Sequence, residues 1–169
     1  MGVPERRGNR SRKIVLIDLE NMLFGSHEGS DDAQSQNRSA EILSLAQARR
    51  PEDTIIVGCN PQLVFLANEL FPVSQIVVGK GKDGADNALI DALDLDRAVE
   101  RYAELCIVSG DNAFCAIAHP ARAAGLSVRI VAPHAGLSTA LRVFADTAVF
   151  LPEPADTHDD DRGLGDVAA

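Results

Sequence analysis

The sequence has few of the features that mark secreted, membrane-spanning or thiol-based proteins. Its 169 residues include three cysteines, Cys59, Cys106 and Cys115, and none of them forms a CxxC pair. This spacing favours buried free thiols in a reducing compartment over a metal or redox site. No apolar run approaches the ~20 residues of a membrane span, and residues 1–13 lack the apolar segment of a secretory signal. We therefore expect a cytoplasmic protein without membrane contacts.

Positive charge is also scarce, and it is unevenly distributed. The formal net charge is −9, with an excess of basic residues in 1–13 and of acidic residues in 152–169. The body between these ends remains acidic, which argues against a broad basic surface for nucleic acid. An acidic body is compatible with carboxylates gathered around metal ions, and equally with an ordinary solvated surface.

Apolar segments alternate with helical segments along most of the chain. Predicted strands cover 13–18, 54–59, 75–79, 105–109, 127–132 and 147–151, and predicted helices cover 40–49, 60–70, 85–102, 112–124 and 138–144. Strands buried on both faces and separated by helices form an open parallel sheet with right-handed crossovers. The fold class expected is therefore α/β, a three-layer, Rossmann-like single domain over residues 13–151.

Three segments fall outside this pattern. Residues 1–12 predict a flexible basic arm, and 152–169, rich in acids and helix breakers, predict a disordered tail. Residues 25–38 are polar and rich in Gly and Ser, which predicts a loop. Ser39 is then the expected cap of the helix over 40–49.

Three aspartates stand where the strands of such a sheet end. Asp18 ends the first strand, Asp111 follows the fourth, and Asp86 opens the helix after the third. Ligand sites in these sheets lie beyond the carboxyl ends of the strands, at the point where strand order reverses. Converging carboxylates raise each other's pKa, and a hard cation such as Mg²⁺ or Mn²⁺ removes that penalty. Each aspartate alone is also explained as a strand end, a helix first turn or a helix cap.

Several segments, in order, resemble the NYN family, a branch of the PIN-like nuclease fold. They are IDLEN at 17–21, KDGADNALIDAL at 82–93, VSGDNAF at 108–114 and LSTALRVFADTAVFL at 137–151. The positions that match the family pattern are Asp18, Asn21, Gly84, Asp86, Asp91, Ser109, Gly110, Asp111 and Phe114. The resemblance covers about residues 13–151.

This resemblance implies a metal-dependent ribonuclease with RNA as its partner. Asp18, Asp86 and Asp111 would be the catalytic residues and the ligands of Mg²⁺ or Mn²⁺, with Asp91 or Asp83 as a further ligand. Asn21 would orient a ligand or a substrate phosphate. Proteins with related folds often form dimers, so a homodimer is an alternative to a monomer here.

Other polar residues near these segments are candidates for binding substrate. Lys80 and Lys82 precede Asp86 and could contact phosphate, although loop lysines are more often simply solvated. Ser109 is read as a turn or water-holding hydroxyl rather than a nucleophile. The amide oxygen of Asn112 is a candidate to replace a missing acid.

That missing acid is the departure from the family pattern. The family motif is SGDxDF, and Ala113 stands where its second acid belongs. The site therefore holds fewer ligands than usual, which leaves open a non-catalytic RNA-binding or regulatory module on the same fold. A phosphatase of the haloacid dehalogenase type is a minor alternative, because Glu20 occupies the position where that family needs a second aspartate. No G-x-G-x-x-G follows the first strand, which excludes a dinucleotide-binding domain.

Overall fold

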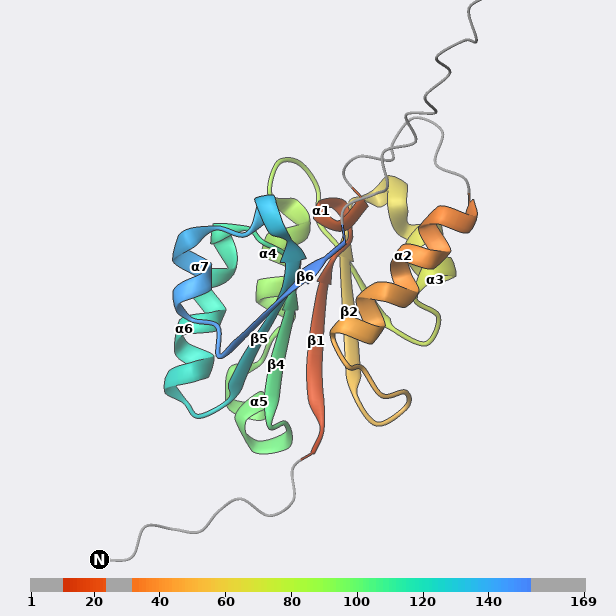
Figure 1. The fold of residues 1–169 in the computed structure, drawn as a ribbon. Helices are drawn as coiled ribbons and strands as arrows, with labels where there is room; N and C mark the ends of the chain where they lie inside the picture. Colours follow the sequence, from red (N-terminus) through yellow and green to blue (C-terminus); the bar gives the residue numbers. More distant parts are fainter. Residues whose placement is uncertain (1–10, 24–31, 153–169) are drawn as a thin grey trace, which may run out of the picture.

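Six parallel strands form one sheet at the centre of the molecule (Figure 1). The structure is a computed structural model that describes residues 11–23 and 32–152. The strand order is β3-β2-β1-β4-β5-β6. The strands are β1 (Lys13–Asp18), β2 (Thr54–Cys59), β3 (Gln75–Val78), β4 (Glu104–Val108), β5 (Ser127–Pro133) and β6 (Thr147–Leu151). The central strands are apolar throughout, as expected for a parallel sheet that is covered on both faces.

Helices cover the two faces of the sheet and make the three layers. One face carries α1 (Leu19–Leu23), α2 (Asp32–Leu45) and α3 (Val64–Leu70). The opposite face carries α4 (Gly84–Ala92), α5 (Leu95–Arg101), α6 (Cys115–Ala123) and α7 (Thr139–Val143). Three short 3₁₀ helices complete the fold, η1 (Pro61–Leu63), η2 (Asn112–Phe114) and η3 (His134–Gly136). No helix in the described part of the chain is long and apolar enough to cross a membrane.

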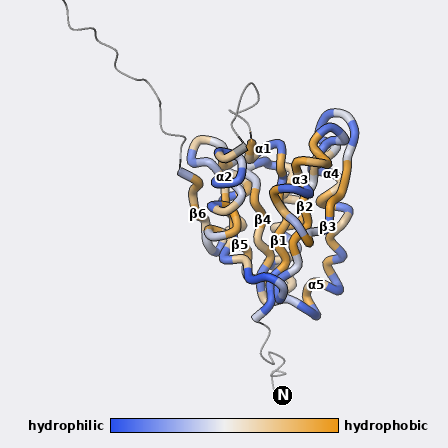
Figure 2. The backbone as a smooth tube through the Cα atoms, turned by 90° about the vertical axis from the view of Figure 1, so that its right-hand side faces the viewer, coloured by the Kyte–Doolittle hydropathy of each residue, from blue (hydrophilic) through white to orange (hydrophobic). Residues whose placement is uncertain are grey.

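Alternation along the strands divides the core into two halves. In β1, Ile14 and Leu16 belong to the core under α4, whereas Val15 and Ile17 belong to the core under α2 and α3. Figure 2 shows the hydrophobic residues concentrated along the central strands, with hydrophilic segments at their ends. The same alternation assigns Asp18, two residues after Leu16, to the face that α4 covers.

The six strands agree with the sequence prediction to within one residue at each end. The first predicted helix differs more, because α2 begins at Asp32 and residues 32–38 are therefore helical. The hydroxyl of Ser39 donates to the carbonyl of Gln36 (2.8 Å) from within the helix and does not cap it. The polarity of this segment predicted a loop, but Ile42 within α2 and Ala46 directly after it pack into the core and hold the helix on the sheet. The rest of the predicted loop, residues 25–31, lies outside the described residues.

The predicted helix over 85–102 is two helices, α4 and α5. Leu93 leaves the helical conformation, and the side chain of Asp94 accepts from the backbone N–H of Arg97 at 3.1 Å, which caps α5. No Gly or Pro marks this break, so the apolar pattern reads as continuous in the sequence.

Candidate active site

The candidate site lies where the strand order reverses, between β1 and β4. The chain continues from β1 toward β2 on one side of this point, and from β4 toward β5 on the other. Diverging connections leave a crevice at the carboxyl ends of two such strands. Asp18 is the last residue of β1, and Ser109, Gly110 and Asp111 follow β4 directly.

Asp18 is a buried carboxyl group held in one orientation. Only 4% of the residue is exposed. Its Oδ1 accepts from the backbone N–H of Asn21 at 3.2 Å, and its Oδ2 accepts from the hydroxyl of Ser109 at 3.0 Å. Burial raises the pKa of Asp18, and these two hydrogen bonds oppose the rise. The carboxyl group is therefore positioned before any ligand arrives.

Ser109 joins the ends of the two central strands. It is completely buried. Its hydroxyl donates to Asp18 and accepts from the backbone N–H of Asp111 at 3.2 Å. Ser109 comes two residues after Ile107, which belongs to the core under α4, so both side chains point to the same face of the sheet. The Asp18 side chain lies on this face too, which explains why it meets Ser109. Ser109 therefore supports Asp18 and Asp111 from the core side, and its side chain does not reach the surface.

Asp86, in the first turn of α4, is the second carboxyl group of the site. The pKa of Asp86 is raised to about 7. Partial burial is the largest cause, and the negative charges of Asp18 and Asp111 are the next largest. Its protonated carboxyl group donates a hydrogen bond to Asp18, and the charge of Asp83 adds to the rise. Asp86 therefore keeps its proton to a higher pH than an ordinary aspartate, and that proton relieves the repulsion between the two carboxyl groups.

Glycines let α4 come close enough to the sheet for this contact. A Cβ atom on Gly58 of β2 would lie 2.5 Å from Cγ of Leu89 in α4. A Cβ atom on Gly79, just after β3, would lie 1.8 Å from the carbonyl oxygen of Gly84. Gly84 of the family pattern therefore has a structural role, since it is half of a glycine–glycine contact that sets the position of Asp86.

Asp111 lies at the start of η2, beside the acid pair. Its Oδ1 accepts from the backbone N–H of Ala113 at 2.7 Å, so it caps η2, and the side chain is exposed. Its charge contributes to the raised pKa of Asp86. Phe114 is fully buried beneath this turn. The position of Ala113 thus contributes a backbone N–H to Asp111 but no acid.

A pocket of about 350 Å³ adjoins Asp111. It is lined by Asn21, Asp111 and Asn112 on one side and by residues 135–138, which follow β5, on the other. The backbone N–H of Ser138 donates to the carbonyl of Gly110 at 2.9 Å and ties the two walls together. Sequence reasoning missed the second wall. Gly136, in the PHAG segment after the fifth predicted strand, is the signal that could have indicated it.

The remaining predicted residues are placed less centrally. Lys80 and Lys82 are exposed in the turn before α4, and neither forms a hydrogen bond or ion pair within the described residues. Asp83, in the left-handed conformation (φ 57°), is close enough for its charge to act on Asp86. Asp91 is exposed on α4 and is not among the charges that raise the pKa of Asp86.

The donor set matches a hard cation in chemistry, although the side chains do not form a finished metal site. Asp18 and Asp86 are in contact, whereas Asp111 acts on Asp86 through its charge. One carboxylate oxygen of Asp111 accepts a hydrogen bond from the backbone N–H of Ala113. Among residues 11–23 and 32–152, no three His, Cys, Asp or Glu side chains converge as a metal-binding group. The available donors are all oxygens, the type that Mg²⁺ and Mn²⁺ prefer.

Comparison with known proteins identifies the family. The family model of the NYN domain matches residues 12–152. This chain belongs to the NYN family. Its α/β sheet is the nuclease-like fold of PIN-like proteins, as the sequence predicted, and NYN proteins are generally ribonucleases.

A solved structure without an assigned activity is among those similar to the NYN chain. The crystal structure of a protein of unknown function from Vibrio parahaemolyticus matches with a TM-score of 0.58 and 14% identity. The match covers 88% of this chain and 97% of the other. At this identity the likeness concerns the fold alone. No protein of curated function matches the sequence.

Proposed function

We propose that this NYN protein is a ribonuclease that hydrolyses RNA phosphodiester bonds with Mg²⁺ or Mn²⁺. The observation that carries the proposal is the contact between the carboxyl groups of Asp18 and Asp86, beside Asp111 at the carboxyl edge of the sheet. A buried and a partly buried carboxyl group in contact destabilise each other when both are ionised. A fold that keeps them together gains most when a divalent cation takes the place of the proton on Asp86.

In this proposal the residues divide into those that hold the cation and those that position them. Asp18, Asp86 and Asp111 would hold the cation, which when bound supplies charge stabilisation at the phosphate and a more acidic water. Ser109 and the backbone of Asn21 keep Asp18 in position.

The pocket beside Asp111 is the proposed place for the nucleotide next to the bond that is cut. Asn21 and Asn112 line it with amide groups that can both donate and accept hydrogen bonds. Asn112 accepts from the thiol of Cys115 at 3.4 Å, which orients its amide. Lys80 and Lys82 would bring positive charge to the phosphates without base preference.

An Asp111→Asn variant tests the proposed chemistry. Purified wild type is expected to cleave single-stranded or structured RNA with Mn²⁺ or Mg²⁺, and to stop when EDTA is added. Asn keeps an oxygen that can accept from Ala113 but removes a charge from the site. We expect loss of cleavage by about a hundredfold, comparable to other losses around metal sites. Cleavage that persists in EDTA, or in the variant at full rate, would contradict the proposal.

A specific observation favours a second candidate, an RNA-binding module that cuts poorly. Ala113 stands where the family has an acid, and Asp111 uses one oxygen to cap η2. The cation would then be held weakly and the protein would bind RNA with little cleavage. RNA binding in the presence of Mn²⁺ without cleavage would identify this case.

An Ala113→Asp variant separates the two candidates further. The added carboxylate lies two residues from Asp111, on the short helix that Asp111 caps. We expect a lower Mn²⁺ concentration for half-maximal cleavage, by about tenfold, because one more hard ligand is available. A Ser138→Asp variant, which adds the same charge on the other pocket wall, serves as control. An unchanged Mn²⁺ requirement in Ala113→Asp would mean that another group already fills that place.

A further inference from the structure

Charge is segregated between the two ends of the sheet. The carboxyl edge carries Asp18, Asp83, Asp86 and Asp111, whose negative charges already act on one another. Such an edge repels the phosphates of an approaching RNA, although Lys80, Lys82 and the arginines near the end of β6, Arg38 and Arg142, oppose this locally. Positive charge on another part of the surface would therefore add to the attraction that an RNA-binding protein needs.

The opposite edge, where the strands begin, holds an excess of positive charge. Lys13 Nζ and Arg129 Nε both donate to the same oxygen of Glu104, at 3.1 and 3.2 Å. The two cationic side chains are only 9% and 13% exposed. The neighbouring pair, Arg49 and Asp53, is balanced, with 3.4 Å between Nη2 of Arg49 and Oδ1 of Asp53. One carboxylate for two largely buried cations leaves this cluster of Lys13, Glu104 and Arg129 with a net charge of +1.

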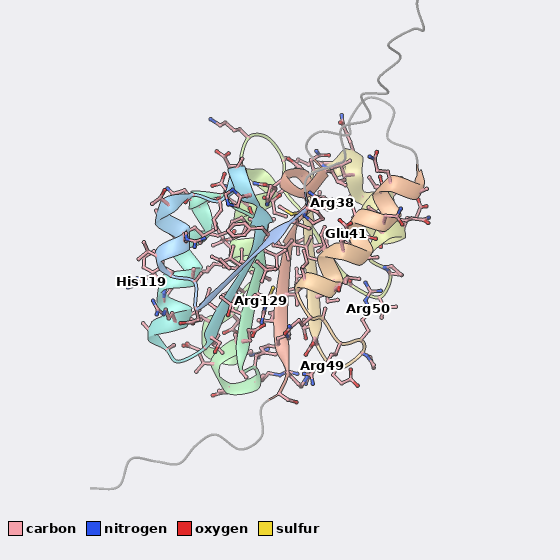
Figure 3. All side chains as sticks on the ribbon, in the orientation of Figure 1. Arg38, Glu41, Arg49, Arg50, His119 and Arg129 are labelled. Carbon is pink, nitrogen blue, oxygen red and sulfur yellow. The ribbon has the colours of Figure 1, made fainter. Side chains whose placement is uncertain are left out.

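A pocket of about 500 Å³ opens over this charge. Lys13 and Arg49 line it together with Ser11, Ser44 and Gln47. The ammonium group of Lys13 has three N–H donors. One donates to the carbonyl of Ala46 (3.2 Å) and one to Glu104. Among the described residues the third N–H has no acceptor, and the hydroxyl of Ser44 makes no hydrogen bond. Figure 3 shows Arg49 toward the end of the molecule where the strands begin.

We propose that this amino-edge pocket binds a backbone phosphate of RNA outside the cleavage site. A phosphate fits because it supplies the missing negative charge and accepts hydrogen bonds from ammonium, guanidinium and hydroxyl groups at once. The five steps of β1 separate this pocket from Asp18 by about 17 Å at ~3.3 Å per residue. This line runs through the buried core, so an RNA strand that contacts both ends must pass over the helices that cover the sheet. The choice of RNA rests on the proposed ribonuclease function.

Gln47→Glu is the variant that tests this pocket. Oε1 of Gln47 accepts from Arg129 at 3.3 Å, so a glutamate there keeps the contact and turns it into an ion pair. The substitution cancels the excess charge and leaves the packing unchanged, and a thermal melt checks that the fold is retained. Gln75→Glu, on the exposed start of edge strand β3, adds the same charge two strands away from β1 and outside the pocket lining, and is the matched control.

Binding is measured by fluorescence anisotropy in EDTA, with a labelled RNA of about twenty nucleotides, which exceeds typical single-strand site sizes. We expect Gln47→Glu to weaken binding by about five- to tenfold and to reduce the slope of log affinity against log salt by about 1. Gln75→Glu is expected to match the wild type. Equal binding by wild type and Gln47→Glu, or equal weakening by both variants, would overturn the proposal.

A second arm of the experiment identifies the source of the phosphate. Inorganic phosphate is expected to compete with RNA for the wild type and not for Gln47→Glu. If inorganic phosphate raises the melting temperature of the wild type alone while RNA binding is the same in both, the pocket serves a small phosphate compound and the RNA proposal is wrong. Because EDTA prevents cleavage, failure here leaves the Asp111→Asn test unaffected, and an inactive protein that still binds RNA at this pocket leaves this inference standing.

Discussion

Asp86→Asn is expected to abolish RNA cleavage and, at pH 8 without metal, to make the protein more stable than the wild type. Cleavage should fall by at least about a hundredfold, since losing groups that merely orient metal ligands costs ~10–100-fold. The gain in stability has a different cause. The Asn side chain carries no charge to repel Asp18 and Asp111, and its amide can still donate to Asp18 as the protonated carboxyl group does.

The stability gain should depend on pH in a defined direction. The pKa of Asp86 rises on folding from 3.8 to about 7, so the folded state holds its proton more tightly than the unfolded state. Asp86 therefore makes the wild type lose stability as the pH rises from about 4 through 7, and the variant lacks this contribution. The difference in melting temperature should be small near pH 4, grow up to pH 7 and then level off.

Two further measurements complete this test. Asp91→Asn, on the same helix and exposed, is the matched control, and it should leave cleavage and the pH dependence of the melting temperature unchanged. Adding Mn²⁺ at pH 8 should raise the melting temperature of the wild type and have little effect on Asp86→Asn. A variant less stable than the wild type at pH 8, or a difference that does not vary with pH, would show that Asp86 is not the strained member of the pair.

Gly79→Ala is expected to be among the most damaging single changes to the fold. Its Cβ atom would lie 1.8 Å from the carbonyl oxygen of Gly84 and 2.6 Å from the backbone nitrogen of Ala85. Backbone atoms cannot move aside as a flexible side chain can, so α4 must shift. We expect the free energy of unfolding to fall by about 3 kcal/mol, at the upper end for overpacking. Urea denaturation measures this loss.

The same shift should reach the site, because α4 carries Asp86. A displacement of about 1 Å can cost ~100-fold in activity, so the folded fraction of Gly79→Ala should cleave RNA at a small fraction of the wild-type rate. Gly136→Ala is the control for the folding cost, since the nearest atom to its added Cβ is 3.5 Å away. Equal stability of Gly79→Ala and Gly136→Ala would mean that the loop before α4 relaxes freely and does not fix the helix.

The strands and the position of the acids could be predicted because both depend on local pattern. Apolar runs such as KIVLID and ELCIV are buried on both faces, and this burial is a property of consecutive residues. The rule that places ligands at the carboxyl edge of a parallel sheet then singles out Asp18, Asp86 and Asp111. The errors in the helices have the same origin, because local polarity hid the start of α2 and local apolarity hid the break after α4.

The pairings between distant residues could not be predicted in this way. Ser109 has an ordinary turn composition around it, and only the register of β4 against β1 brings its hydroxyl to Asp18. Gly79 and Gly84 are both natural loop residues, and their close contact appears only when α4 docks on the sheet. The cations Lys13 and Arg129 are separated by more than a hundred positions and meet because both flank Glu104.

The sequence by itself therefore determined the fold class, the family and the edge of the sheet at which the acids stand. These follow from periodicity and from short ordered motifs, which need no knowledge of what lies across space. The tertiary structure alone decided that the carboxyl groups of Asp18 and Asp86 meet, that Ser109 is a buried support and that Lys13 and Arg129 share one carboxylate at the amino edge. Each of these is a balance of charge and desolvation among residues far apart in the chain, which exists only once the sheet has formed.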